Sequence, residues 1–204
     1  VFLDEEIIPG RRISIGTRYT LSRLVADGYA AVGDSAFMTI PIMGSGIEAS
    51  MKAGKLLADT VITNGTYQKE LTAETLWRYQ TGYFHKIAFL FSAIDVLKRW
   101  ILHVDDDVIN WIFTKVVPTP MLEAVTDFII KRASGKECLF TVLKYLPKTI
   151  FALLRRRSFL KEAGKILKDA GRAALVTLQI PNKYDPAEIA TWQERYEACF
   201  PHRS

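Results

Sequence analysis

The sequence has few cysteines and lacks a long apolar run. Its two cysteines, Cys138 and Cys199, lie far apart in 204 residues and match no metal-ligand spacing. We therefore expect reduced thiols and a cytoplasmic protein, because disulfide-stapled domains are short and rich in cysteine. The longest apolar run, Ile87–Ile94, stops at Asp95 and falls well short of the roughly 18–20 residues needed to span a bilayer. The sequence thus excludes a transmembrane protein and a disulfide scaffold.

Clusters typical of metal sites and hydrolases are also absent. The three histidines do not group in the sequence. The acidic triplet Asp105–Asp107 has no His or Glu partner at ligand spacing and is more typical of a helix start. Ser35 and Ser45 lack the surroundings of a nucleophile elbow. We predict no metal site and can name no catalytic residue.

The most informative stretch covers residues 28–59. A short apolar run with strand character, Gly28–Val32, ends at Gly33-Asp34, and Gly44-Ser45-Gly46 then opens a helical pattern that extends to about Thr63. A carboxylate at a strand end accepts hydrogen bonds from hydroxyls, and a bare helix start offers N–H groups and a positive dipole end. This arrangement favours an extended polar cofactor. The alternative is a glycine-rich loop between a core strand and a core helix.

The same stretch resembles the second FAD-binding signature of the geranylgeranyl reductase family, flavoproteins related to the flavin monooxygenases with a glutathione-reductase-type FAD fold. The resemblance implies that Asp34, after Gly33, holds the ribityl chain. It also implies that Pro41, Gly44, Ser45, Gly46 and Ile47 line the flavin. The chain has Ser45 where the family usually has Glu, and Phe37 where it usually has Gly. The matching residues are Gly33, Asp34, Ala36, Pro41, Gly44, Gly46, Ile47, Met51, Lys52 and Gly54.

The resemblance also implies the fold class and the domain organisation. We predict an α+β, predominantly α protein, in which residues 1–65 form the C-terminal part of an FAD-binding domain and residues 66–204 form a helical substrate-facing or membrane-facing region. In the family this signature comes late, and the chain has no N-terminal G-x-G-x-x-G turn for the adenosine half of FAD. We therefore expect the C-terminal part of a larger flavoprotein, inactive as an isolated chain.

Periodicity predicts helices over most of the chain after residue 65. One long amphipathic helix is expected from Leu71 to about Ile101, with Leu76, Tyr83, Leu90 and Leu97 in one buried row. Strand character is expected before it, at 12–15, and a turn at Asp27-Gly28. Residues 173–180 are ambiguous between strand and helix. The other helices expected are one from Asp105–Asp107 to Pro118, and those over 120–133, 136–146, 148–157, 158–170 and Asp185 to about Cys199.

Positive charge is concentrated in residues 131–172, which hold 12 Lys/Arg against 3 Asp/Glu. Arg155, Arg156 and Arg157 follow an apolar segment, a combination that suits an anionic membrane surface or the phosphate of a prenyl substrate. An ordinary solvated face is the alternative. Nucleic acid is not expected, because no reading motif accompanies the charge.

Together these features predict an FAD-dependent oxidoreductase that reduces isoprenoid double bonds of the geranylgeranyl type. Its substrate would be a prenyl lipid, and its location cytoplasmic and peripheral on the membrane. Two alternatives stay open: a flavin monooxygenase or other FAD-dependent dehydrogenase, distinguished by oxygen use, and a helical lipid- or partner-binding module without flavin activity. The residues identify neither the electron donor nor the general acid.

Overall fold

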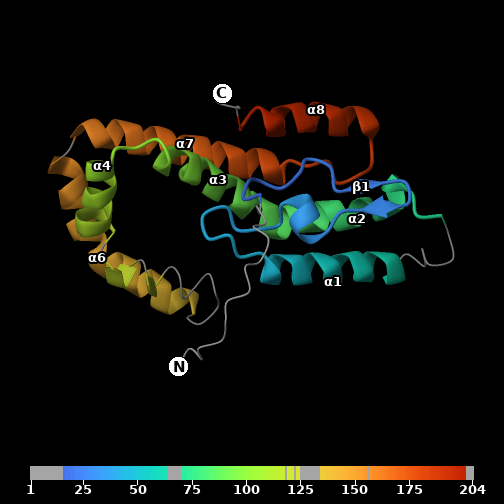
Figure 1. The fold of residues 1–204 in the computed structure, drawn as a ribbon, viewed down its shortest axis with the longest axis horizontal. Helices are drawn as coiled ribbons and strands as arrows, with labels where there is room; N and C mark the ends of the chain where they lie inside the picture. The colour runs from blue at the N-terminus through green and yellow to red at the C-terminus, as the bar shows by residue number, and fades with distance from the viewer. Residues whose placement is uncertain are drawn as a thin grey trace, which may run out of the picture.

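Helices make up most of the fold, with one small antiparallel hairpin (Figure 1). The computed structural model describes residues 16–63, 70–117, 119–121, 123–124, 134–155 and 157–200, without the side chains of residues 135, 138, 153, 154, 157 and 158. A mostly helical chain with a two-stranded sheet agrees with the α+β, predominantly α prediction. The elements are β1 (Val25–Ala26), β2 (Tyr29–Ala30), η1 (Gly33–Ala36), α1 (Ile47–Thr63), α2 (Ala73–Tyr83), η3 (Phe84–Ala88), α3 (Phe89–Ile101), α4 (Asp106–Trp111), η4 (Ile112–Val116), α6 (Gly135–Arg155), α7 (Arg157–Leu178) and α8 (Pro186–Glu197).

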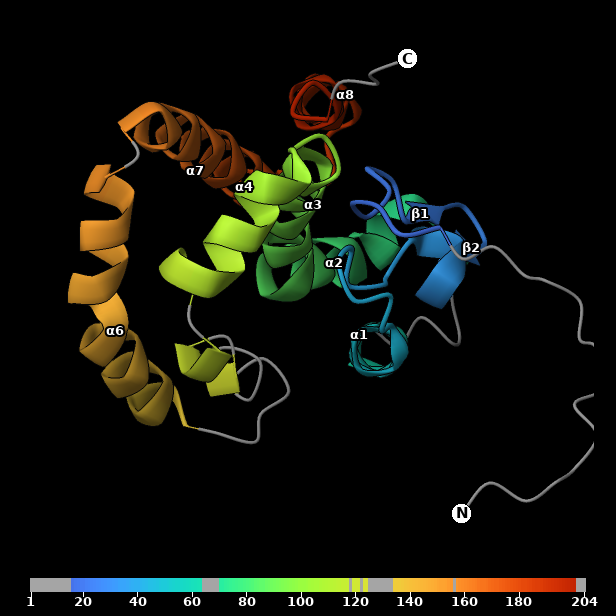
Figure 2. The same cartoon turned by 60° about the vertical axis from the view of Figure 1, so that its left-hand side comes forward.

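The long helix predicted from Leu71 to Ile101 forms the centre of the molecule as α2, η3 and α3 in unbroken succession. α1 packs along α2, and α7 packs along α3 (Figures 1 and 2). The middle segment η3 is a π-helical turn. Such a turn inserts an extra residue into the helix and changes which side chains face a neighbour.

The predicted buried row is wrong in its second half. Leu76 and Tyr83, before the π-helical turn, are fully buried, but Leu90 and Leu97 are 43% and 37% exposed. Beyond the turn the buried positions are Phe91, Ser92 and Asp95. They belong to a neighbouring row that runs from Trp77 through Phe84 and faces α7 along α3.

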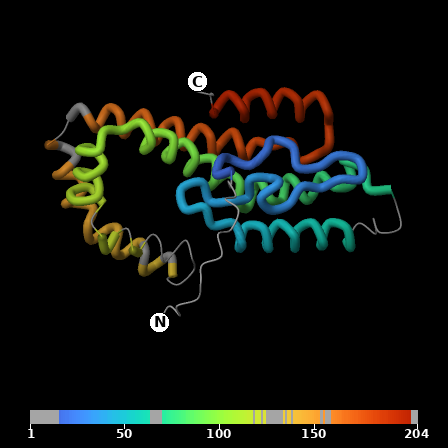
Figure 3. Tube along the Cα trace, in the orientation of Figure 1, coloured from blue at the N-terminus to red at the C-terminus, as the bar shows by residue number. Residues whose placement is uncertain are grey.

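The hairpin is anchored to α2 by side chains of that helix. The Gln80 amide accepts from Leu24 N at 2.9 Å and donates to Ser22 O at 3.0 Å, and the Tyr79 hydroxyl donates to Ala31 O at 2.7 Å. The predicted turn is confirmed, with Gly28 at φ 68° and the Asp27 carboxylate accepting from the first amide of α2 at 2.8 Å. Figure 3 shows this N-terminal segment running alongside the central helix.

A polar and aromatic core joins α3, α7 and α8 to the N-terminal segment. The Thr177 hydroxyl donates to Ser92 Oγ at 2.8 Å, and the buried Tyr196 hydroxyl donates to Thr20 O at 2.9 Å. Tyr19 stacks on Phe200 with ring centroids 3.8 Å apart. Residues from before and after position 65 therefore share one core. The domain boundary itself stays a prediction.

Several predicted helix limits are corrected. Pro147 lies inside α6 and does not divide it, and α7 continues past Gly171 to Leu178, which resolves the ambiguous segment as helix. The last helix starts at Pro186 as predicted, with the Asp185 carboxylate capping Ala187 N at 2.9 Å. The expected strand at 12–15 and most of the expected helix at 120–133 lie outside the described residues. Among the described helices, none has the length and apolar character required to cross a bilayer.

Candidate functional site

The turn that carries Asp34 follows the hairpin directly. Regular strand pairing ends at Ala30, and extended backbone continues to Val32 (φ −139°, ψ 146°), so the strand is shorter than predicted. Gly33 at φ 74° then opens the 3₁₀ turn η1, closed by Met38 N donating to Gly33 O at 3.1 Å. A side chain at Gly33 would be strained. The turn leaves Asp34 exposed at the surface.

Phe37 ends this turn in the left-handed conformation, at φ 53° and ψ 45°. Among the described residues it alone has positive φ without being glycine, at a cost of about 1–2 kcal/mol. Its ring lies against Gly16, where a Cβ would come within 2.5 Å of it, and the Arg18 guanidinium lies 5.0 Å from its centroid. This is the position where the similar family usually has glycine. The turn is therefore retained without glycine, and ring packing holds the strained backbone.

The loop between η1 and α1 folds back on itself. Ile40 N donates to Ser45 O at 2.9 Å, Gly44 N donates to Ile40 O at 2.9 Å, and Gly44 takes φ 68°. Pro41 is buried beneath the loop, whereas Ser45 is exposed. α1 begins at Ile47, three residues later than predicted. Gly44-Ser45-Gly46 is thus the connection into the helix and not its first turn.

Gly46 lets the start of α1 approach the Asp34 turn. A Cβ at Gly46 would lie 2.8 Å from Thr39 Cγ2, 3.3 Å from Met38 O and 3.5 Å from Asp34 Oδ1. The Asp34 carboxylate therefore lies beside the helix start. The first amides of a helix have no acceptor inside it. The structure thus brings a hydrogen-bond acceptor close to the amide donors of the helix start; that this arrangement binds a cofactor stays a prediction.

Beside this loop the surface is apolar and slightly hollowed. Ile47 is 77% exposed and Met51 is 71% exposed. Both line a shallow depression of about 590 Å³, together with Ser45, Glu48, Lys52 and Lys55. Lys52 pairs with Glu48 at 2.5 Å. The loop thus combines polar backbone, one carboxylate and an apolar surface, a set of groups that fits a cofactor with a hydroxylated chain and a flat ring.

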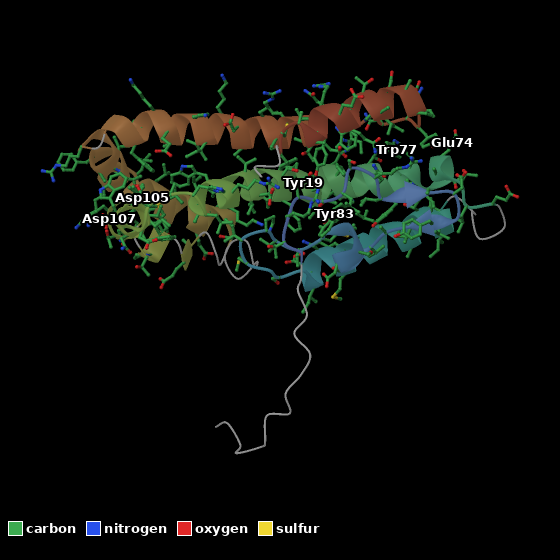
Figure 4. The ribbon with its side chains drawn as sticks, turned by 45° about the horizontal axis from the view of Figure 1, so that its top comes forward. Tyr19, Glu74, Trp77, Tyr83, Asp105 and Asp107 are labelled. Atoms are coloured by element: carbon green, nitrogen blue, oxygen red, sulfur yellow. The ribbon has the colours of Figure 1, made fainter. Side chains whose placement is uncertain are left out.

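The weaker candidate residues take structural roles or lie apart. His85 Nε2 is 3.2 Å from Leu178 O, a contact between η3 and the end of α7. Asp105 and Asp107 lie at the end of the molecule opposite Trp77 (Figure 4). Asp105 occupies the N-cap position of α4, but its side chain accepts no hydrogen bond there. In the part of the chain that the structure describes, no group of three or more His, Cys, Asp or Glu side chains could hold a metal.

The structure also contains a hollow that the sequence analysis missed. It has a volume of about 510 Å³ and lies between α3, α7 and the end of α8. Trp100 Nε1 donates to Glu162 Oε1 across it at 2.8 Å, and burial raises the pKa of the Cys199 thiol at its edge. Its residues come from three separate segments, so no local pattern could have identified it. The side chains that carry charge around it are Arg99, Glu162, Lys165, Asp169 and Arg172.

Comparisons with known proteins find relatives among the geranylgeranyl-type reductases. No family model matches the chain. The chain is 28% identical over 131 residues to digeranylgeranylglycerophospholipid reductase 1 of Methanothermobacter thermautotrophicus, covering 64% of this chain and 30% of that protein. It is 30% identical over 138 residues to the reductase of Methanothrix thermoacetophila (65% and 32%), and 20% identical over 183 residues to that of Sulfolobus acidocaldarius (90% and 38%).

The chain thus spans about a third of the length of these curated relatives. Their names describe oxidoreductases that act on a prenylated glycerophospholipid. The similarity supports a relationship to geranylgeranyl-type reductases.

Proposed function

We propose that this chain is the C-terminal part of an FAD-dependent oxidoreductase that reduces the isoprenoid double bonds of a prenyl lipid. The observation that carries the proposal is the position of the Asp34 carboxylate, beside Gly46 at the start of α1. Similarity to digeranylgeranylglycerophospholipid reductases supports the reaction and the substrate class. Each feature alone fits many proteins, but their coincidence favours a flavin reductase.

The proposed flavin-facing residues are Gly33, Asp34, Pro41, Gly44, Ser45, Gly46 and Ile47. Asp34 would accept hydrogen bonds from the ribityl hydroxyls, since an ionised carboxylate is an acceptor only. Gly33 and Gly44 would hold the backbone in the two left-handed positions that shape the loop. Ile47 would offer its exposed side chain to the ring. The start of α1 would place positive partial charge near a negatively charged reduced ring.

When bound, FAD would supply hydride chemistry, and the residues of this chain would orient the cofactor and exclude water from one of its faces. The exposed apolar side chains near the loop, Ile42, Met43 and Met51, are 47%, 51% and 71% exposed. These side chains would cover apolar parts of the cofactor or of the lipid. No residue beside the loop is assigned as the general acid.

Flavin content tests the proposal in the complete protein that contains this chain. Asp34→Ala should weaken FAD binding by about ten- to hundredfold, because hydrogen bonds to a charged group contribute about 1.5–3 kcal/mol. Asp59→Ala is a matched control, since Asp59 is an exposed acid on α1 far from its start. Equal FAD retention in the wild type, the Asp34 variant and the control would contradict the assignment.

Oxygen use separates the reductase from a flavin monooxygenase. A reductase should convert a prenyl lipid under anaerobic conditions when given reduced flavin. A monooxygenase should consume oxygen in proportion to its product. Anaerobic turnover of a geranylgeranylated lipid, followed by mass spectrometry of the saturated product, decides between them. Product that forms only with oxygen would overturn the reductase proposal while leaving the FAD site intact.

A further inference from the structure

The outer face of α6 exposes six large apolar side chains. At about 100° of rotation per residue, these six fall within an arc of roughly 140° on the helix surface. Soluble monomers rarely expose a contiguous apolar patch of this kind without a partner. The residues and their exposed fractions are Leu139 58%, Phe140 71%, Leu143 55%, Leu146 39%, Ile150 47% and Phe151 60%; we call them the α6 apolar face.

The opposite side of α6 packs inward, which fixes the direction of this face. Val142, Tyr145 and Thr149 are half-buried, and the Thr149 hydroxyl donates to Val116 O in η4 at 2.7 Å. Figures 1 and 2 place α6 at one end of the molecule, apart from α1 and the hairpin. Because the helix is held by its other side, the α6 apolar face cannot turn into the core.

Positive charge accompanies the α6 apolar face. The helix α6 carries one acidic residue, Glu137, and four basic residues: Lys136, Lys144, Lys148 and Arg155. Lys144, Lys148 and Arg155 lie along one edge of the apolar arc by helical rotation, and the Arg155 guanidinium lies 4.8 Å from the Phe151 ring centroid. The ion pairs found between described residues involve none of these four cations.

The one acid of the helix is engaged at its start. Glu137 Oε2 accepts from Ser134 N at 2.8 Å and from Ser134 Oγ at 3.0 Å. The backbone hydrogen bond from Ser134, followed by the one from its hydroxyl, lowers the pKa of the Glu137 carboxyl. Its negative charge therefore acts on the helix N-terminus. The cations along the edge keep their charge available for an external partner.

From this arrangement we propose that the α6 apolar face docks on the surface of an anionic lipid bilayer. Exposed Phe, Leu and Ile beside a row of Lys and Arg are what an interfacial helix requires: the apolar side chains enter the acyl boundary and the cations meet the headgroups. A second copy of this chain would bring the same cations and no added acid on this helix, so charge complementarity favours anionic lipid. The proposal stands independently of the flavin site.

The structure also changes which residues carry this contact. Of the three arginines that the sequence analysis selected, Arg155 borders the α6 apolar face, whereas Arg156 and the side chain of Arg157 lie outside the described residues. Lys148 and Lys144, which lie about two and three turns before Arg155 along the same edge, are expected to contribute as much as Arg155 does. The apolar contribution comes chiefly from Phe140 and Phe151.

Cosedimentation with vesicles tests the proposal, using equal parts phosphatidylglycerol and phosphatidylcholine, or phosphatidylcholine alone. One variant removes the cations (Lys144→Gln, Lys148→Gln, Arg155→Gln) and a second removes the apolar contacts (Phe140→Ser, Leu143→Ser, Phe151→Ser). Arg78→Gln, Lys86→Gln, Lys183→Gln is the matched control for charge, because these residues are exposed on other elements. Leu167→Ser, Leu175→Ser is the control for exposed apolar residues, at 74% and 61% exposure on α7.

The wild-type chain should sediment with the anionic vesicles and much less with the neutral ones. Each cation contributes about fivefold to such binding, so the first variant should bind roughly ten- to hundredfold more weakly. Binding should also weaken between about 0.1 M and 1 M salt, as the Debye length falls from about 10 Å to about 3 Å. Both controls should bind as the wild type does, with circular dichroism unchanged in all variants.

Three results would overturn the proposal. The first is absence of binding to anionic vesicles at low salt. The second is an equal loss of vesicle binding in the α6 variants and in the controls, which would mean that net charge or general hydrophobicity causes the binding. The third is concentration-dependent dimerisation that the α6 variants abolish without any vesicle binding, which would assign the face to a second copy of the chain. Loss of FAD binding in the Asp34 variant leaves all these results unaffected.

Discussion

Replacing Gly46 with alanine tests how closely the start of α1 packs against the turn that holds Asp34. The added methyl group would lie 2.8 Å from Thr39 Cγ2 and 3.3 Å from Met38 O. Carbon atoms attract one another best at about 3.5–4.0 Å, so the first contact is repulsive. Thr39 is only 2% exposed, and its hydroxyl donates to Gly16 O at 3.4 Å. The threonine therefore has little room to move.

The expected cost follows from these contacts. Overpacking a tight site by a methyl group costs about 1–3 kcal/mol. Gly46 does not have the positive φ found at Gly33 and Gly44, so alanine can adopt its backbone conformation and should recover about 0.4–1 kcal/mol through the unfolded chain. The net destabilisation should be about 1–2 kcal/mol. For a chain of this length that corresponds to a melting temperature lower by roughly 2–8 °C.

Thermal and urea unfolding followed by circular dichroism measure this effect. Gly54→Ala is the matched control on the same helix, because a Cβ at Gly54 meets nothing within 4 Å. It should stabilise the chain by roughly 0.5–1 kcal/mol. Thr39→Ser removes Cγ2 and keeps the hydroxyl. The free energy of unfolding of the double variant Thr39→Ser, Gly46→Ala should therefore be about 1 kcal/mol higher than the sum of the two single effects predicts. If Gly46→Ala is as stable as the control, or if the two changes are strictly additive, the close packing is refuted.

Two further predictions concern the core. Asp95 is fully buried and pairs with Arg99 Nε at 2.7 Å and Lys98 Nζ at 3.4 Å, so Asp95→Ala should lower the free energy of unfolding by about 2–4 kcal/mol; a change below about 0.5 kcal/mol in urea unfolding would contradict this. Burial raises the pKa of Tyr79, Tyr83 and Tyr196 above the usual tyrosine range. As the pH rises above about 10, the unfolded chain loses protons that these residues retain when folded, so stability should fall with rising pH. Ultraviolet titration of tyrosinate should then show a group of tyrosines that ionises only when the chain unfolds at high pH. Ionisation of all tyrosines together in the folded chain would contradict this prediction.

Local signals were sufficient for several elements. Asp27-Gly28 predicted a turn because few other residue pairs accept its backbone angles, and Asp185-Pro186 predicted a helix start because the aspartate caps free amides. Gly33 was predicted at the end of a strand and Gly44 at the start of a helix, and both instead shape the loop with positive φ. In the Asp34 loop, the arrangement follows largely from residues within about fifteen positions of one another. Whether the loop binds FAD stays a prediction.

What the sequence by itself determined was helical content, turn positions and the loop that carries Asp34, because each depends on neighbouring residues. Only tertiary structure decided which faces of the helices are buried. Leu90 is exposed and Phe91 is buried because α3 packs chiefly against α7. Periodicity alone could not decide which of two neighbouring apolar rows would meet that helix. Similarly, the sequence predicted two helices with bulky apolar and basic residues over 136–157, whereas the structure forms one helix there. Packing against Val116 decided that Phe140 and Phe151 face outward, because burial depends on partners that lie far away along the chain.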